Sequence, residues 1–416
     1  MTDRQRDGPQ KSLHGASMES SSDTEIAANE IWTITVLIGL ALMMQVSINI
    51  MIPALPAISG DLHAAPVWEK LTLTAFMIGY GLSPLIIGPL SDRYGRRPVL
   101  LCGLAVFVAA SVGCTIAPSI ESLVWARFLQ GVGGGSGLIL HRAIARDLYA
   151  GVKLARVSAY LSAGQGIGPM MAPLVGAVLQ EQFGWRSTFA FTAIFGASLM
   201  LGYAAVIAES NRNQTKRLDI LALRHDYREV LGARQFLRAA LTTAFSAAGW
   251  YTFFAGAPTL FIKHHGMSPS EFGAFVSLLI FGFIGAGILV GRKVVAWGEE
   301  RLVAAGITLA SLGIAGTGIL ALIGAEQFAL LAIAMTIYSS GVGILMPLLS
   351  TAAIRPYGHI AGTASAAWAI VFMGTSAAGT VMAGVVEGIS ASAFYAVMFV
   401  FQCLSVCAHL MMAKRS

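Results

Sequence analysis

Long apolar runs with almost no charge constrain the fold of this chain more than any other feature. Of its 416 residues, 56% are hydrophobic and only 12% are charged, whereas a soluble domain has about 25% charged residues. An apolar run of about 20 residues is long enough to cross a bilayer as a helix. The sequence therefore predicts an all-α polytopic membrane protein whose main partner is the lipid bilayer.

Twelve such runs can be counted, so both ends of the chain are expected on the same side of the membrane. Most of the 27 Lys and Arg residues fall on the side of the N-terminus, and the opposite loops hold only Lys70, Arg186 and Lys263. Because basic loops stay inside, both termini are predicted to be cytoplasmic. The predicted spans are 31–53, 71–88, 99–117, 122–140, 157–180, 187–207, 239–262, 272–291, 302–324, 327–350, 360–386 and 389–413.

The polar segments divide the chain into domains. Residues 1–30 are polar and are expected to form a disordered cytoplasmic tail. Residues 208–238 form a basic cytoplasmic linker, for which an amphipathic helix on the inner membrane face is one interpretation. This linker separates an N-terminal six-helix half, residues 31–207, from a C-terminal six-helix half, residues 239–413.

Composition also argues against several classes of partner. The net charge of +6 could indicate a nucleic-acid partner, but the short basic loops of a membrane protein explain it better. The four cysteines have no metal-ligand spacing, and no constellation of catalytic residues stands out. We expect no cofactor, no metal and no nucleic acid, and a monomer.

The stretch "GPLSDRYGRRPVL", residues 88–100, is a short polar turn between the second and third spans. A loop that merely keeps positive charge inside explains its arginines but not Asp92, which is placed to cap the third helix or to pair with the basic residues. The stretch resembles the signature loop of the major facilitator superfamily, which latches the two halves together in the outward-facing state. The matching positions are Gly88, Asp92, Arg93, Gly95, Arg96 and Arg97.

A decayed counterpart of this loop follows the eighth span. "GRKVVAWGEER", residues 291–301, keeps Gly291 and Gly298 but lacks the acid. Two similar halves fit the parallel repeat of such transporters. The resemblance implies the major facilitator fold, with twelve transmembrane helices in two six-helix halves.

The fourth span contains "RFLQGVGGGSG", residues 127–137, whose glycines favour close helix packing over phosphate binding. A charge in hydrocarbon is costly, which makes Arg127 a functional candidate unless its side chain snorkels outward. Arg127, Gln130 and Gly131 resemble the fourth-helix motif of the superfamily, to which proton coupling and substrate response are assigned.

The fifth span contains "GQGIGPMMAPLVG", residues 164–176. Its prolines and glycines bend the helix and permit a tight seam, and an ordinary kinked helix is the alternative interpretation. The stretch resembles the antiporter motif, which is characteristic of exporters in the superfamily. The positions that carry this resemblance are Gly164, Gly168, Pro169 and Pro173.

"SINIMIPALPAI" in the first span, "HIAGTASA" at 359–366 and the run 236–273 resemble the Bcr/CflA drug exporters. Those proteins commonly have an acid in the first helix, where this sequence has Asn49. None of the 21 acids falls inside a predicted span, so we expect Arg127 to be unpaired, with Asn49 and Gln45 as polar neighbours. Such a cation favours an anionic or neutral substrate.

Aromatic and polar residues in the central spans are further candidates for a substrate pocket, although ordinary helix packing explains each of them equally well. They are Tyr80, Gln165, Trp250, Tyr251, Phe254, Tyr338 and Trp368.

Together these features predict a proton-coupled exporter of small amphipathic molecules in a bacterial inner membrane, working by alternating access. The alternative within transport is a dedicated exporter of an endogenous metabolite, such as a carboxylate siderophore. A membrane enzyme or sensor is the third interpretation, and the absence of a catalytic constellation argues against an enzyme.

Overall fold

The computed structural model describes residues 12–211, 220–264, 266–323, 328–386 and 391–411, which form helices and connecting turns with no strand among them. A long helix covers each of the twelve predicted runs, and short helices join some of them. The α-helices are α1 (Ser12–Asn49), α2 (Leu55–Asp61), α3 (Pro66–Tyr94), α4 (Arg96–Thr115), α5 (Ile120–Leu148), α6 (Gly151–Phe183), α7 (Arg186–Val206), α8 (Ile220–Gly232), α9 (Arg234–Pro258), α10 (Pro269–Trp297), α11 (Glu299–Leu322), α12 (Phe328–Ile354), α13 (Ala361–Val386) and α14 (Ala391–Met411).

Within the described ranges, nine helices are long and apolar enough to cross a membrane. Helices α5, α6 and α9 are not among them, although they contain 29, 33 and 25 residues. Their length suffices, so their composition sets them apart. Glycines and polar residues replace large apolar side chains along α5. Helix α9 is buried along most of its length, so its side chains face other helices rather than lipid.

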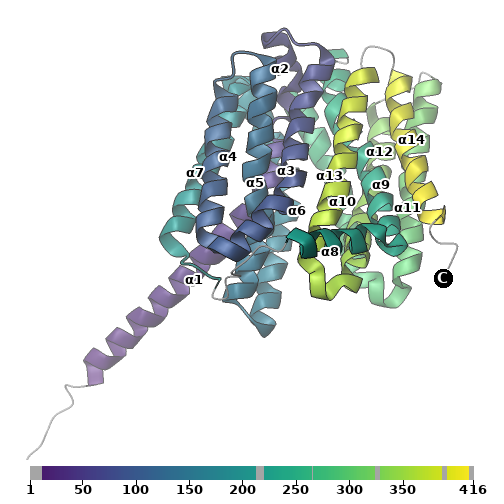
Figure 1. Ribbon diagram of the computed structural model, residues 1–416. Coiled ribbons are helices and arrows are strands. Elements are labelled where there is room, and N and C mark those ends of the chain that lie inside the picture. Colours follow the sequence, from purple (N-terminus) through teal and green to yellow (C-terminus); the bar gives the residue numbers. More distant parts are fainter. Residues whose placement is uncertain (1–11, 212–219, 265, 324–327, 387–390, 412–416) are drawn as a thin grey trace, which may run out of the picture.

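The helices form two groups, α1–α7 and α9–α14, which stand side by side in Figure 1. Packing repeats between them: α3 and α4 both pack on α5, and α10 and α11 both pack on α12. The groups meet where α3 packs on α13 and where α6 packs on α10. With the short connecting helix α2 left aside, this is the division into two six-helix halves that the sequence predicts.

The N-terminal segment differs from its prediction. Helix α1 begins at Ser12 and runs without a break to Asn49, so residues 12–30 are helical rather than disordered, and Figure 1 shows this part of α1 extending away from the bundle. Residues 16–30 contain three Ala, three Glu and one Met, which favour helix, beside four Ser. Residues 1–11 of the predicted tail lie outside the described residues.

The linker contains the amphipathic helix α8, which crosses one end of the bundle in Figure 1. Val230 on α8 is buried in a hydrophobic cluster with Phe236 of α9, and Tyr227 packs against this cluster. Helix α8 also packs on α13. Helix α8 of the linker is therefore docked against the C-terminal half.

The turns that precede α4 and α11 have the same backbone conformation. Gly95 has φ 100° and ψ 158°, and Gly298 has φ 80° and ψ 151°. L-residues with side chains rarely adopt such positive φ values. The two glycines thus mark the internal repeat at the level of the backbone.

The two halves are joined at the ends of helices that the sequence places outside. Lys70 Nζ at the start of α3 donates to Thr259 Oγ1 beyond α9, at 3.2 Å. The backbone N–H of Ser270 at the start of α10 donates to Glu181 at the end of α6, at 2.8 Å. These bonds close the bundle at that end.

Candidate functional site

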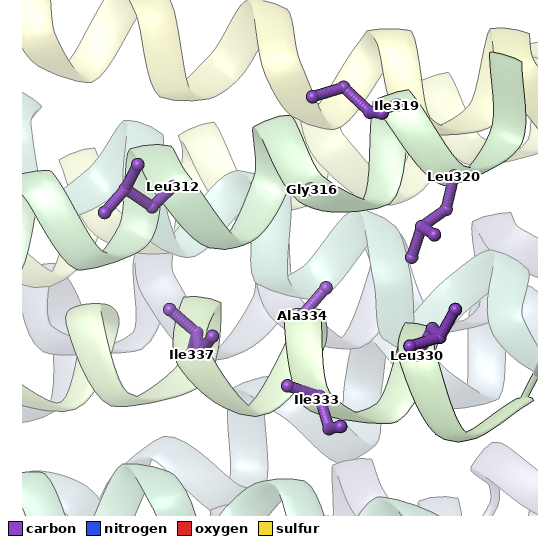
Figure 2. A pocket seen from close by; sticks show the side chains of 8 residues that line it. All are labelled: Leu312, Gly316, Ile319, Leu320, Leu330, Ile333, Ala334 and Ile337. Atoms are coloured by element: carbon purple, nitrogen blue, oxygen red, sulfur yellow. The ribbon is translucent and has the colours of Figure 1, made fainter. Parts of the chain in front are cut away.

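A shallow apolar groove of about 290 Å³ lies between α11 and α12 (Figure 2). All of its lining residues are apolar, and several, including Leu312, Ile319 and Ile333, are exposed large hydrophobics. A surface of this kind suits contact with lipid tails. The groove offers no polar group that could orient a substrate, so the candidate site is built from other residues.

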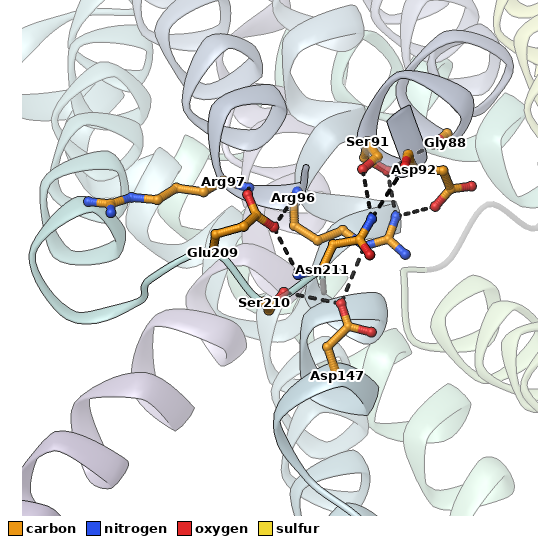
Figure 3. Close-up of polar contacts among 9 residues, drawn as sticks. All are labelled: Gly88, Ser91, Asp92, Arg96, Arg97, Asp147, Glu209, Ser210 and Asn211. Carbon is orange, nitrogen blue, oxygen red and sulfur yellow. Dashed lines mark hydrogen bonds and ion pairs between the residues drawn. The ribbon is translucent and has the colours of Figure 1, made fainter. Parts of the chain in front are cut away.

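Arg96 is the centre of a polar network in the signature loop (Figure 3). Its guanidinium pairs with Asp92 one turn earlier, at 2.5 Å, and donates to Ser91 Oγ at 2.7 Å. It also reaches Asp147 at the end of α5, at 3.4 Å. Asn211, after α7, donates to the carbonyl oxygens of Ser91 and Asp92. The network ties α3, α4, α5 and the segment after α7 together.

Asp92 pairs with a basic residue, as one of the two predicted alternatives has it, but Glu209 takes the capping role. The carboxylate of Glu209 accepts from the backbone N–H groups of Arg96 and Arg97, at 2.8 and 3.0 Å, at the start of α4. Desolvation raises the pKa of Glu209, but these bonds and those from Asn211 and Ser210 lower it more. The net pKa lies below its usual value, so the cap is ionised at neutral pH.

Among the described residues, the contacts of the signature loop lie within the N-terminal half and the segment directly after α7. Arg97 donates to the carbonyl oxygen of Ala204 on α7 at 2.8 Å, and Arg93 lies over the ring of Tyr94. Gly88 faces open space. In this conformation the loop braces one half, and a latch between the halves stays a prediction for the outward-facing state.

Arg127 is completely buried and does not snorkel. Its Nε donates to the carbonyl oxygen of Thr72 on α3, and its Nη1 donates to Ser47 O on α1 and to Gln130 Oε1. The guanidinium stacks over the ring of Phe76, 4.3 Å from the centroid. Arg127 therefore lies inside the N-terminal half, where carbonyl dipoles and π-electrons face its charge, although its buried Nη2 has no hydrogen-bond partner among the described residues.

The expected contact between Asn49 and Arg127 is wrong. Asn49 is buried, but its Nδ2 donates to the Gln45 carbonyl oxygen at 2.7 Å and to Gln45 Oε1 at 3.4 Å. No hydrogen bond joins the two side chains in the described part of the chain, because the Asn49 amide is taken up by Gln45 one turn earlier on α1. The polar neighbour on α1 is the carbonyl oxygen of Ser47.

Gln130 and the glycines of α5 support Arg127 from both sides. Gln130 Nε2 donates to Ser111 Oγ on α4 at 2.7 Å and to Thr192 Oγ1 on α7 at 3.2 Å. A Cβ at Gly131 would stand 2.2 Å from the carbonyl oxygen of Phe76. The predicted packing role of these glycines is confirmed.

The antiporter-like motif forms a seam between α6 and two neighbouring helices. Gly164 and Gly168 pack closely on α1, with Gly168 against Gln45. Pro169 and Pro173 lie inside the continuous helix α6, and the backbone of Pro173 packs on Gly273 of α10. Helix α6 thus connects its own half to the other one.

Five of the seven candidate pocket residues lie in the C-terminal half, and the other two lie in the N-terminal half. Trp250, Phe254 and Tyr338 pack together inside the C-terminal half. The ring centroid of Trp250 lies 4.7 Å from that of Phe254 and 6.2 Å from that of Tyr338. Tyr251 meets Phe372 edge to face, and Trp368 stacks on Phe372 at 4.8 Å. The remaining two, Tyr80 and Gln165, lie in the N-terminal half.

Arg142 lies in the N-terminal half beside Gln165, and the sequence analysis missed it. The predicted span ended at residue 140, but α5 continues to Leu148. Arg142 Nη2 donates to Gln165 Oε1 on α6 at 3.2 Å, and Leu138, one turn before Arg142, packs against the hydrophobic cluster that contains Tyr80. Its side chain is exposed. A helix that outlasts its apolar run is the signal that could have identified it.

The prediction that no acid lies within a span is also corrected. Glu69 and Lys70 lie in α3, and they are 2% and 0% exposed. They form an ion pair at 2.5 Å where the two halves meet. The assignment of Lys70 to an outer loop was wrong because α3 begins before its apolar run does.

Comparisons with known proteins agree with this architecture. Residues 36–380 match the family described as the Major Facilitator Superfamily. The chain is 32% identical to the uncharacterized MFS-type transporter YdgK of Bacillus subtilis strain 168, over 79% of this chain and 82% of that one. It is 31% identical to a chloramphenicol resistance protein of Pseudomonas aeruginosa (81% and 80%) and 28% identical to multidrug resistance protein D of Escherichia coli K12 (79% and 82%).

Solved structures show the same fold at low sequence identity. The human organic anion transporter MFSD10 superposes with a TM-score of 0.66 at 17% identity, covering 92% of this chain and 99% of that one. The xylose transporter XylE of E. coli superposes with a TM-score of 0.69 at 16% identity (92% and 97%). These relatives and neighbours are transporters rather than enzymes. The chain belongs to the Major Facilitator Superfamily and is a multi-pass membrane transporter.

Proposed function

We propose that this transporter exports small amphipathic molecules, including antibiotics, across a bacterial inner membrane in exchange for protons. Its relatives include proteins named for chloramphenicol and multidrug resistance. The α6 motif at Gly164, Gly168 and Pro169 supports the direction of transport, and the matching stretches support membership of the Bcr/CflA group. The distribution of Lys and Arg supports cytoplasmic termini.

One observation carries the mechanism. The halves are joined at the predicted outer end, through Lys70–Thr259 and Glu181–Ser270, whereas Arg142 is exposed although its partner Gln165 stands near the middle of α6. From the closed outer contacts and the exposure of Arg142 towards the opposite ends of the helices, we infer an inward-facing conformation. Transport then requires that the outer contacts open as the inner ends close, about a site near the midplane.

Two acids are placed to carry the proton. Asp92 is 51% exposed and pairs with Arg96 on the cytoplasmic side. Glu69 is buried against Lys70 at the outer contact between the halves, so opening that end would expose it to the other compartment. Asn49 cannot titrate, which leaves these two positions as our coupling candidates.

A dedicated exporter of an endogenous carboxylate, such as a siderophore, is the second candidate function. The exposed cation Arg142, which bonds to Gln165 near the middle of α6, favours it, because a guanidinium binds a carboxylate through paired hydrogen bonds.

The test uses everted vesicles in which the pH gradient and the membrane potential are imposed separately. Proton-coupled export predicts that chloramphenicol accumulates in the vesicles when their interior is acidic, and that Asp92→Asn or Glu69→Gln abolishes this dependence on the pH gradient. Glu300→Gln, an exposed acid at the start of α11, is the matched control. Accumulation that ignores the pH gradient in wild-type vesicles would contradict proton coupling.

A further inference from the structure

Arg142 on α5 and Gln165 on α6 form a polar pair to which the packing of the apolar core assigns no role. Arg142 Nη2 donates to Gln165 Oε1 at 3.2 Å. Within the described part of the chain Arg142 makes no ion pair, and this bond to Gln165 uses one of its five N–H donors. The guanidinium therefore has donors left for a ligand.

The pair faces the inside of the bundle rather than lipid. On α6, Gln165 lies opposite Ile167 and Val178, whose exposed apolar side chains mark the side that faces the membrane. On α5, Arg142 lies on the same side as Gly131 and Gly135, which pack on α3. Helix α5 is itself enclosed by α1, α3 and α4.

Aromatic side chains from the other half complete the surroundings. Tyr80 of α3 and Phe372 of α13 belong to one hydrophobic cluster that spans both halves, and Tyr251 of α9 packs against it. Leu138, one turn before Arg142 on α5, packs against the same cluster. Tyr251 meets Phe372 of α13 edge to face, and Trp368 stacks on Phe372. Gln165, Tyr80 and Phe372 all stand near the middle of their helices.

We propose that Arg142 and Gln165 bind the anionic group of an aromatic organic anion, whose ring packs against Tyr251 and Phe372. This inference rests on the proposed export function and names the class of substrate. It moves the role of the substrate cation from Arg127, which is enclosed in the N-terminal half, to Arg142. Because the ligand touches both halves, its binding would couple their movement.

The experiment measures binding of three naphthalene probes that differ only in their polar group: naphthalene-2-sulfonate, naphthalene-2-sulfonamide and trimethyl(2-naphthyl)ammonium. Calorimetry on the purified full chain in lipid nanodiscs gives the three affinities. We expect wild type to bind the sulfonate best, and Arg142→Gln to weaken sulfonate binding by about tenfold or more while sulfonamide binding changes little.

Three further variants make the test specific. Arg142→Lys should fall between wild type and Arg142→Gln, since it keeps the charge and loses the planar fork. Gln165→Glu should abolish the preference for the sulfonate, because an acid beside Arg142 would pair with the guanidinium and cancel its charge. Arg146→Gln is the control, since it removes an exposed charge one turn further along α5, and it should bind as wild type does.

Two outcomes would overturn the site. One is a wild-type protein that does not prefer the sulfonate. The other is an equal loss of sulfonate binding in Arg142→Gln and Arg146→Gln, which would reduce Arg142 to general positive charge at the inner surface. Export of chloramphenicol, which is uncharged, tests the proposed function separately. Normal export with no effect of Arg142 on anions refutes the site alone, whereas selective anion binding without export refutes export alone.

Discussion

Arg96 and Glu299 begin corresponding helices in the two halves, and they carry opposite charges. Each follows a glycine with positive φ, Gly95 or Gly298. Arg96 pairs with Asp147 at the end of α5, and Glu299 pairs with Arg355 just after α12, at 3.2 Å. The second half thus keeps an ion pair between the same two places with its signs exchanged, although its loop has lost the acid of the first.

This relationship predicts that the C-terminal pair tolerates a charge exchange. Glu299→Arg alone places like charges together and should lower the free energy of unfolding, and adding Arg355→Glu should restore it. Because the pair is exposed, the coupling energy should be about 0.2–1 kcal/mol. Chemical unfolding in detergent measures the cycle. Additive effects of the two substitutions would show that the pair contributes nothing.

Asp92→Asn should leave insertion and abundance near wild type and reduce transport several-fold, since it removes the partner of Arg96 at an exposed position. Export of chloramphenicol, normalised to the amount of protein in the membrane, is the measurement. If the variant transports normally at equal abundance, the loop serves topology alone.

Arg127→Lys should lower stability by about 1.5–3 kcal/mol, because a lysine cannot reproduce the fork of bonds to Thr72, Ser47 and Gln130. Since Arg127 is enclosed, transport of anionic, neutral and cationic probes should fall by the same factor. A selective loss of anion transport would instead place Arg127 in the substrate pathway.

Two glycine substitutions should change the free energy of unfolding in opposite directions. Gly131→Ala places a Cβ against the backbone of Phe76 and should destabilise by about 1–3 kcal/mol. Gly318→Ala on α11 meets nothing within 4 Å and should stabilise by up to about 1 kcal/mol through helix propensity. Thermal unfolding of the two purified variants compares them directly, and a stable Gly131→Ala would contradict the tight packing of α5 on α3.

The cap of α4 by Glu209 should depend on pH. The pKa of Glu209 is lower in the folded protein than its ordinary value of 4.5. Its stabilisation is therefore complete above pH 4.5 and is lost as the pH falls through the folded value. Glu209→Gln should lower stability by about 0.5–2 kcal/mol at neutral pH, and the gap from wild type should shrink in acid. A gap that stays constant with pH would exclude an ionised cap.

The architecture could be predicted because it follows from local sequence. Apolar runs mark membrane helices, and the repeat of Gly95 and Gly298 marks the two halves. The polar contacts could not be predicted from local sequence, because they join residues that are far apart in the chain. Lys70 and Thr259, for example, are 189 positions apart. Arg142 escaped for another reason. Hydropathy locates the apolar part of a helix, whereas backbone hydrogen bonds carried α5 on through the charged residues that follow.

The low hydropathy of α5, α6 and α9 has a consequence for biogenesis. A segment enters the bilayer from the translocon according to its own transfer free energy, and these three are the segments least able to do so alone. They must wait beside the channel for apolar neighbours, α3 and α4 for α5, α1 for α6, and α13 and α14 for α9. Since α13 and α14 are made after α9, the insertion of α9 would be complete only once both have followed it, which makes the loss of α13 or α14 far more harmful to α9 than their distance in sequence suggests.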